Sequence, residues 1–171
     1  MIREQKFFVV FDKTRSLNFN DINQSGQRLA RYINNNIRHK KDLKIRSLDN
    51  IDFLITRETA YKIASRDKVK SINGKLNKMS DNLYSVKLRA GLYIDQLLKY
   101  SIGNNKVFKD TKNHHFAKDG FIYRKAYYLD VDKKYYSITI SIGIKDGVNT
   151  VYNLGKIKEA EFPQLTQGRD R

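Results

Sequence analysis

The chain has 171 residues, of which 40% are hydrophobic and 12% aromatic, and this composition excludes an intrinsically disordered protein. Its 34 Lys and Arg residues outnumber the 18 Asp and Glu residues, and the formal net charge of +16 favours a polyanionic partner, namely RNA, DNA or an anionic lipid surface. The absence of cysteine excludes disulfides and thiolate metal sites, and no apolar run reaches the length of a signal peptide or a membrane span. We therefore expect a soluble, cytoplasmic protein with one α+β domain over residues 1–160 and a flexible tail over residues 161–171, where the only proline lies.

The N-terminal part of the chain predicts a buried strand followed by an amphipathic helix. The run Lys6–Phe11 (KFFVVF) is short, apolar and rich in residues that favour strands. Asn18 or Asn20 can cap a helix that extends to about Ile37. The apolar stripe of this helix has spacings of three and four residues and consists of Ile22, Gly26, Leu29, Ile33 and Ile37.

The opposite face of this helix is polar and basic, and it ends in the segment Arg38–Lys41 (RHKK). Cations suit a helix C-terminus, so a solvated helix end explains them, and contact with nucleic-acid phosphates is the alternative. Across the whole chain, the candidate nucleic-acid contacts are Arg28, Arg31, Arg38, Lys125 and Asn153.

The middle of the chain predicts a hairpin and then further helices. Residues Leu43–Thr56 contain two short strands around an Asp49-Asn50 turn. The polar, lysine-rich segment Arg57–Asp81 predicts a short helix and an exposed loop around Asn73-Gly74. The helix that follows should end at Gly103 in a left-handed conformation. Its apolar face consists of Leu83, Val86, Ala90, Ile94, Leu97 and Leu98.

The C-terminal part, residues 115–159, predicts an antiparallel β-meander. Three strand-like runs, FIYRKAYYLDV, KYYSITISIGI and NTVYNLGKI, are separated by Asp132-Lys133 and by Lys145-Asp146-Gly147, which have hairpin chemistry. The middle run alternates, with Tyr136, Ile138, Ile140 and Ile142 on one face and Ser137, Thr139 and Ser141 on the other. One face should therefore be core and the other a surface lined by hydroxyl groups.

Residues near this meander provide the groups needed for RNA cleavage without a metal. In such cleavage the 2′-OH of the substrate is the nucleophile, and the protein supplies an acid, a base and cations for the developing charge. Histidine suits the proton transfers because it titrates near neutral pH. The candidate catalytic residues are His114, His115, Lys118, Arg124, Thr139, Ser141 and Tyr152.

Each of these residues also has a structural explanation. Adjacent histidines before a strand are commonly one exposed and one packed side chain, and Lys118 lies in a turn where lysine needs no special role. Arg124 could be a solvated strand residue, and the hydroxyl groups could be the wet face of a half-exposed sheet. We expect no metal and no cofactor, since no ligand spacing or glycine-rich phosphate loop is present.

The sequence resembles a known superfamily. The order of a strand, an amphipathic helix, a DQLL helix and the segment HHFAKDGFIYRKAYY…YYSITISIG…TVYNLGKIKE is similar to the barnase/EndoU/colicin/RelE-like (BECR) nuclease domains of phage and mobile-element polyvalent proteins. The likeness is strongest over Leu92–Glu159. It implies a metal-independent RNase in which helices pack on an antiparallel sheet of about four strands. It also implies site residues at His115 (or His114), Lys118 or Arg124, Thr139 or Ser141, and Tyr152-Asn153.

These observations lead to two functional hypotheses. The first is a toxin-like or phage-encoded endoribonuclease that acts in the cytoplasm of a bacterial host, with His115 as the proton-transfer residue. Its partners would be RNA, with DNA as a further possibility, and an immunity protein. The second is a non-catalytic phage anti-defence or nucleic-acid-binding protein that binds a nucleic acid or a host defence complex that handles one. Neither hypothesis involves a membrane.

Overall fold

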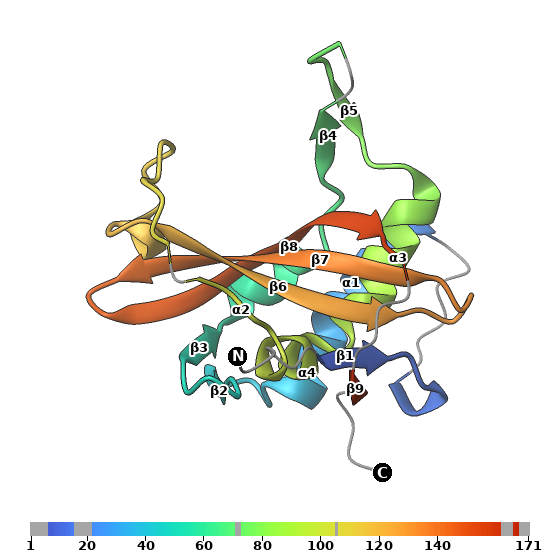
Figure 1. Ribbon diagram of the computed structural model, residues 1–171, viewed down its shortest axis with the longest axis horizontal. Helices are drawn as coiled ribbons and strands as arrows, with labels where there is room; N and C mark the ends of the chain where they lie inside the picture. Colours follow the sequence, from blue (N-terminus) through green and yellow to red (C-terminus); the bar gives the residue numbers. More distant parts are fainter. Residues whose placement is uncertain (1–6, 16–21, 71–72, 105, 162–165, 168–171) are drawn as a thin grey trace, which may run out of the picture.

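The computed structural model describes residues 7–15, 22–70, 73–104, 106–161 and 166–167, and it has an α+β fold (Figure 1). A seven-stranded sheet has the order β2-β3-β8-β7-β6-β1-β9, and a separate hairpin consists of β4 and β5. The strands are β1 Phe7–Val10, β2 Leu43–Arg46, β3 Asp52–Ile55, β4 Lys68–Lys70, β5 Leu76–Lys78, β6 Phe121–Leu129, β7 Tyr135–Lys145, β8 Val148–Glu159 and β9 Thr166–Gln167. The helices are η1 Lys13–Arg15, α1 Ile22–Tyr32, η2 Ile33–Ile37, α2 Arg57–Ile63, α3 Asp81–Gly91, α4 Ile94–Lys99 and η3 His115–Ala117.

The predicted C-terminal meander is confirmed. β7 pairs antiparallel with both β6 and β8. Asp146 and Gly147 both have positive φ (50° and 77°), which allows the tight two-residue turn between β7 and β8. The alternation in β7 is also as predicted: Tyr136, Ile138, Ile140 and Ile142 of the predicted core face are buried, and Ser137, Thr139 and Ser141 of the other face are only partly covered.

The sheet is larger and more mixed than the sequence predicts. β1 lies parallel to β6 with Val9 opposite Tyr128, and β9 adds a further parallel partner to β1. At the other side of the meander, β3 runs parallel to β8. β2 and β3 form the predicted antiparallel hairpin, in which Asn50 has a φ of 65°. β9 lies within the predicted tail, whose other residues beyond Glu161 fall outside the described part of the chain.

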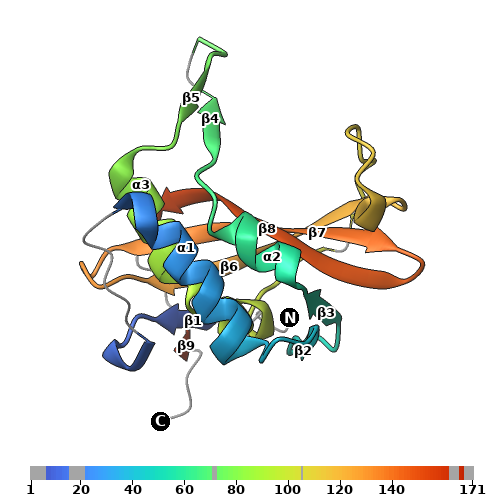
Figure 2. The same cartoon turned by 180° about the vertical axis from the view of Figure 1, so that it is seen from behind.

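The α-helices cover one face of the sheet, and the opposite face is open except where η3 packs on β7 beside Gly143 (Figure 1 and Figure 2). Figure 2 shows α1 and α2 in front of the strands, whereas β6, β7 and β8 face the viewer in Figure 1. The predicted stripe of α1 and η2 packs into this core through Leu29, Ile33 and Ile37, which are buried. The predicted caps of this helix, Asn18 and Asn20, lie outside the described residues.

The second predicted helix is broken into α3 and α4, and this corrects the expectation of one helix ending at Gly103. The break lies at Leu92 and Tyr93, both fully buried. A guanidinium nitrogen of Arg15 donates to the Leu92 carbonyl at 3.0 Å, and the Tyr93 hydroxyl donates to the Asp12 carbonyl at 2.6 Å. The Arg15 bond gives the Leu92 carbonyl an acceptor role outside the helix, the Tyr93 bond ties the break to the N-terminal segment, and α4 ends at Lys99.

The segment predicted as an exposed loop around Asn73-Gly74 forms the β4–β5 hairpin, which projects from the body of the protein (Figure 1). Gly74 has a φ of 76°, a conformation that glycine adopts without strain. In the described part of the chain, no helix has both the length and the apolar character needed to cross a membrane.

Candidate active site

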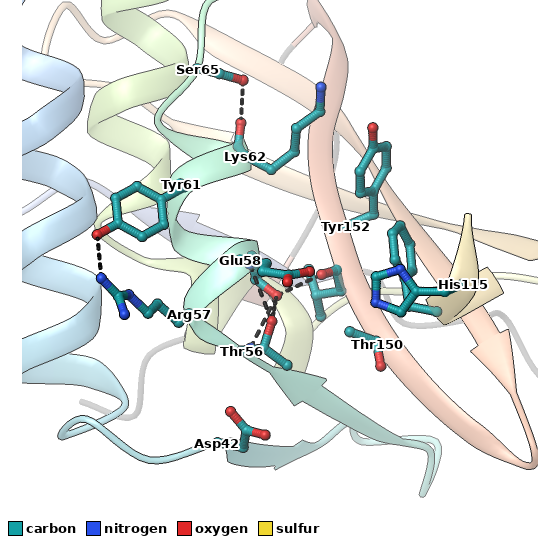
Figure 3. A pocket seen from close by; sticks show the side chains of 13 residues that line it. Asp42, Thr56, Arg57, Glu58, Tyr61, Lys62, Ser65, His115, Thr150 and Tyr152 are labelled. Atoms are coloured by element: carbon teal, nitrogen blue, oxygen red, sulfur yellow. Dashed lines mark hydrogen bonds between the residues drawn. The ribbon is translucent and has the colours of Figure 1, made fainter. Parts of the chain in front are cut away.

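A hollow of about 690 Å³ lies between α2, β8 and η3 (Figure 3). We call it the α2–β8 hollow. It is lined by Asp42, Thr56, Arg57, Glu58, Thr59, Tyr61, Lys62, Ser65, His115, Phe116, Thr150, Val151 and Tyr152. Two predicted site residues, His115 and Tyr152, are therefore brought to one place by elements that are distant in the sequence.

α2 is fixed against β8 by its own N-terminal cap. The Thr56 side chain accepts from the Thr59 amide at 3.2 Å, and the Thr59 side chain accepts from the Thr56 amide at 3.0 Å, which forms a capping box. The Thr59 hydroxyl also donates to the Val151 carbonyl at 2.7 Å. This buried bond sets the rotation of α2, so that Glu58 and Lys62, one helical turn apart, both line the hollow.

His115 begins η3 and has an exposed side chain. Figure 3 shows it across the hollow from α2, with Glu58 extending from α2 toward the same space. An imidazole and a carboxylate are the two side-chain groups best suited to general acid–base chemistry near neutral pH. The hollow therefore contains a candidate proton donor and a candidate proton acceptor on separate elements, η3 and α2.

Tyr152 reaches the hollow because β8 is irregular at this point. Ser141 pairs with Asn153 while the next residue of β7, Ile142, pairs with Val151, so Tyr152 is the extra residue of a β-bulge. Bulges redirect side chains in this way. The Lys62 ammonium nitrogen lies 5.1 Å from the centre of the Tyr152 ring, a cation–π contact that joins α2 to β8.

An aromatic cluster supports this side of the hollow. The rings of His114, Phe116 and Phe121 lie 5.1, 5.1 and 5.8 Å from the ring of Tyr152. His114 is a member of this cluster and is not among the residues that line the hollow. It corresponds to the packed member of the histidine pair, and His115 to the exposed one.

His114 is held by Asp110. Its ring Nδ1 lies 3.2 Å from both carboxylate oxygens, and its backbone amide donates to the carboxylate at 2.6 Å. Burial of the Asp110 carboxyl acts against its charged form, but hydrogen bonds from the amides of Lys112 and His114 and from the His114 ring outweigh it, so the pKa of Asp110 is below its usual value. Asp110 therefore fixes the loop that leads into η3 and the position of His115.

Arg124 does not have the position that a phosphate-binding role requires. Only 1% of it is exposed, and its guanidinium donates to the two carboxylate oxygens of Asp49 at 2.7 and 2.8 Å and to the Ser101 carbonyl at 2.7 Å. The prediction that it is a solvated or substrate-facing strand residue is wrong. The buried Arg124 side chain joins β6 to Asp49 of the exposed β2–β3 turn.

Two of the predicted nucleic-acid contacts are also buried. Asn153 is 9% exposed, and its amide donates to Asp67 at 3.1 Å. Arg38 is 8% exposed and bonds to Asn34 and Asp42, so it is not the solvated helix end expected from the sequence. Arg28 and Arg31 are exposed on α1, as predicted.

The remaining predicted residues lie outside the α2–β8 hollow. Thr139 and Ser141 are on the open face of β7, where Thr139 is paired with Lys125 of β6. Lys118 is exposed directly after η3. Within the described residues, no three His, Asp or Glu side chains are grouped so as to hold a metal ion.

Sequence reasoning missed the contribution of α2. The sequence predicts its segment RETAYKI only as a short polar helix. In the structure, Glu58 and Lys62 are spaced by four residues, as are Arg57 and Tyr61, and the two pairs form neighbouring faces. This spacing, directly after a strand, was the available signal. Comparisons with protein-family models, curated proteins and solved structures find no significant match to this chain.

Proposed function

We propose that this protein is an endoribonuclease that cleaves RNA through the substrate's own 2′-OH without a metal ion. The observation that carries the proposal is that His115 and Glu58 line one hollow from separate elements, η3 and α2. Lys62 and Arg57 line the same hollow and supply positive charge for a phosphate.

The reaction assigns a role to each of these groups. Glu58 removes the proton of the 2′-OH as its oxygen forms a bond to phosphorus, and His115 donates a proton to the 5′-oxygen as its bond to phosphorus breaks. The products are a 2′,3′-cyclic phosphate and a 5′-hydroxyl end. Lys62, beside Tyr152, stabilises the negative charge that develops on the phosphate oxygens, a role for which one well-placed group contributes roughly 10²–10³ in rate.

We propose further that the chain is a divergent member of the BECR superfamily. The support is the resemblance over residues 92–159, together with an α+β architecture in which helices cover one face of a sheet built around an antiparallel meander. Membership of this superfamily would imply a toxin-like role in the bacterial cytoplasm. It would also imply an immunity protein as a partner.

The test is a cleavage time course on total RNA in EDTA with the parent protein and with His115→Ala and Glu58→Gln. Each substitution removes one proton-transfer group, so each should lower single-turnover cleavage by about 10²-fold or more. Products of the parent should end in a 2′,3′-cyclic phosphate. RNA affinity should change little for His115→Ala, because Lys62 and Arg57, which line the same hollow, are unchanged in this variant.

Lys112→Ala is the matched control, because Lys112 is exposed in the loop that precedes η3 and does not line the hollow. This variant should cleave like the parent, and circular dichroism should show that all variants are folded. Equal cleavage by His115→Ala and the parent would remove His115 from the mechanism. A parent that cuts no RNA in EDTA would refute the proposed activity.

A second candidate function, nucleic-acid binding without cleavage, is favoured by the open face of the sheet. Tyr123 is 42% exposed on β6, and Lys125, on the same face, is also exposed. Beside them on β7 lie Ser141, opposite Tyr123, and Thr139, opposite Lys125. Exposed aromatic rings and cations on a sheet can stack bases and contact the backbone of a single strand. A parent that binds RNA in EDTA and leaves it intact would establish binding without cleavage. An anti-defence role is one function that such a binding protein could serve.

A further inference from the structure

A second hollow, of about 390 Å³, adjoins the α2–β8 hollow. We call it the Arg38 hollow. Its lining comes from the end of α1, from η2 and the turn after it, and from α2, and it comprises Arg31, Asn34, Asn35, Arg38, Lys40, Arg57 and Tyr61. Arg57 and Tyr61 line both hollows. In Figure 3 these two side chains lie on the side of α2 that faces α1, away from His115.

The lining of the Arg38 hollow is strongly basic. Four of its residues are cations, and none of the described residues that line it is acidic. Arg38 has an acidic partner in Asp42, at 3.0 Å, but Asp42 lines the other hollow. Three cations, Arg31, Lys40 and Arg57, therefore remain to attract an anion, and their side chains are exposed.

Arg38 gives this hollow a fixed donor. Its side chain is 7% exposed, and its two terminal nitrogens donate to Asn34 and Asp42, each at 3.0 Å. Its Nε is buried and has no hydrogen-bond partner among the described residues. A buried donor without a partner is costly, and an anion in the hollow lowers this cost by placing a negative potential beside the guanidinium.

The backbone after η2 brings Lys40 to the same place. His39 and Lys40 both have positive φ (49° and 61°), and the Lys40 amide donates to the Asn34 carbonyl at 2.7 Å. This turn directs the chain back over the helix end, so the exposed Lys40 lines the same hollow as the buried Arg38.

We propose that the Arg38 hollow binds a backbone phosphate of the RNA at least one nucleotide away from the phosphate that is cleaved beside His115. The proposal rests on the proposed function and specifies its substrate class: a single-stranded RNA that crosses α2 at Arg57 and Tyr61. Tyr61 is 52% exposed, and the Arg57 guanidinium lies 5.6 Å from its ring centre, so this pair can stack a base and contact the backbone between the two hollows. A dinucleotide is too short to occupy both hollows.

Binding to an oligoribonucleotide with 2′-O-methyl groups, which cannot be cut, tests the proposal without depending on cleavage. We compare the parent with Arg31→Gln and Lys40→Gln over a range of salt concentrations. Each substitution should weaken binding and reduce the log–log dependence of affinity on salt, and the reduction has an upper limit of about 0.7, the value for one phosphate contact with a single strand.

Lys133→Gln is the matched control for Lys40→Gln. Both lysines are exposed and have left-handed backbone conformations, with φ of 64° and 61°, but Lys133 lies in the β6–β7 turn. The control should bind like the parent with the same salt dependence. Equal affinity and equal salt dependence for Lys40→Gln, Arg31→Gln and Lys133→Gln would refute the phosphate site.

Cleavage assays separate this proposal from the proposed function. If the parent cuts RNA in EDTA, Lys40→Gln should lose rate on a long RNA and keep its rate on a dinucleotide; equal losses on both substrates would refute the phosphate site and leave the activity standing. If the parent cuts nothing but Lys40→Gln and Arg31→Gln bind more weakly than Lys133→Gln, the phosphate site stands and the activity falls. A parent that binds no RNA would refute both.

Discussion

Lys87 of α3 shows how a single buried charge couples this fold to pH. Its side chain is fully buried, and its ammonium group donates to the Ser65 carbonyl at 2.7 Å and to Asp67 at 2.9 Å. Burial lowers the pKa of Lys87 to about 8, and the nearby charge of Lys62 acts in the same direction. Asp67 raises the pKa and offsets only part of this effect. Asp67 also accepts from Asn153, so this group connects α3 to β8 beside the α2–β8 hollow.

The lowered pKa predicts that stability rises with pH above about 8. Between about 8 and the ordinary lysine value near 10.5, the unfolded chain binds the Lys87 proton and the folded protein does not, so the free energy of unfolding increases with pH in this window. The contribution is about 3 kcal/mol across the window. Urea denaturation at a series of pH values, for the parent and for Lys87→Met, measures it. The variant should lack this rise, and identical pH dependences would contradict the assignment.

The sequence indicates that Arg124 is buried, but it does not indicate the partner of this residue. Its position in β6 has the same parity as Ile122, Ala126 and Tyr128, so alternation alone placed it on the core face. Its partner, Asp49, lies in the turn between β2 and β3, and no local pattern connects these two positions. Buried charged residues are recognisable by parity, but their partners require the tertiary fold.

At the scale of elements, the position of η3 depends on a glycine in β7. A Cβ atom at Gly143 would lie 2.5 Å from the Phe116 ring and 2.9 Å from the Ala117 Cβ. Only the absence of a side chain at this position allows η3 to pack directly on β7. Since His115 is the first residue of η3, the same contact positions the candidate proton donor.

Gly143→Ala should therefore displace η3. We expect a loss of about 1–3 kcal/mol in the free energy of unfolding, as for other overpacked positions, and a loss of RNA cleavage larger than the fraction unfolded explains. Urea denaturation and the EDTA cleavage assay measure the two effects. Gly155→Ala is the control, because a Cβ atom there has no neighbour within 4 Å. If both variants behave like the parent, η3 does not depend on Gly143.

The elements differ in how far the sequence predicts them. The meander β6–β8 and the hairpin β2–β3 were predictable, because their pairing is set by alternation and by turns such as Asp146-Gly147 that lie between adjacent strands. The parallel partners of β6 and β8 were not, because β1 and β3 reach them from distant parts of the chain. The sequence does not predict the α2–β8 hollow for the same reason: α2 follows β3 directly, and the pairing of β3 with β8 sets the position of α2.

At the scale of the whole molecule, the net charge of +16 has two opposite consequences. Like charges repel within the folded protein, and added salt screens this repulsion. Added salt also weakens attraction to a polyanion. Raising the NaCl concentration from low to physiological should therefore increase the midpoint of urea denaturation while it lowers RNA affinity. A denaturation midpoint that falls with salt would show that the charge is balanced locally and does not destabilise the fold.

The place of β1 in the sheet has a consequence for how the chain folds as it is synthesised. β1 leaves the ribosome before β6 and β9, between which it lies in the sheet, and the β6 partner of Val9, Tyr128, is made more than a hundred residues later. Its apolar residues remain without their sheet partners until β6 has been made, and such transiently exposed apolar segments are bound by chaperones. Such long-range pairing also makes closure of this edge a late and slow event. If the proposed site is active, the cell that makes this protein contains it first as an incomplete sheet, and cleavage becomes possible only after this edge of the sheet has closed.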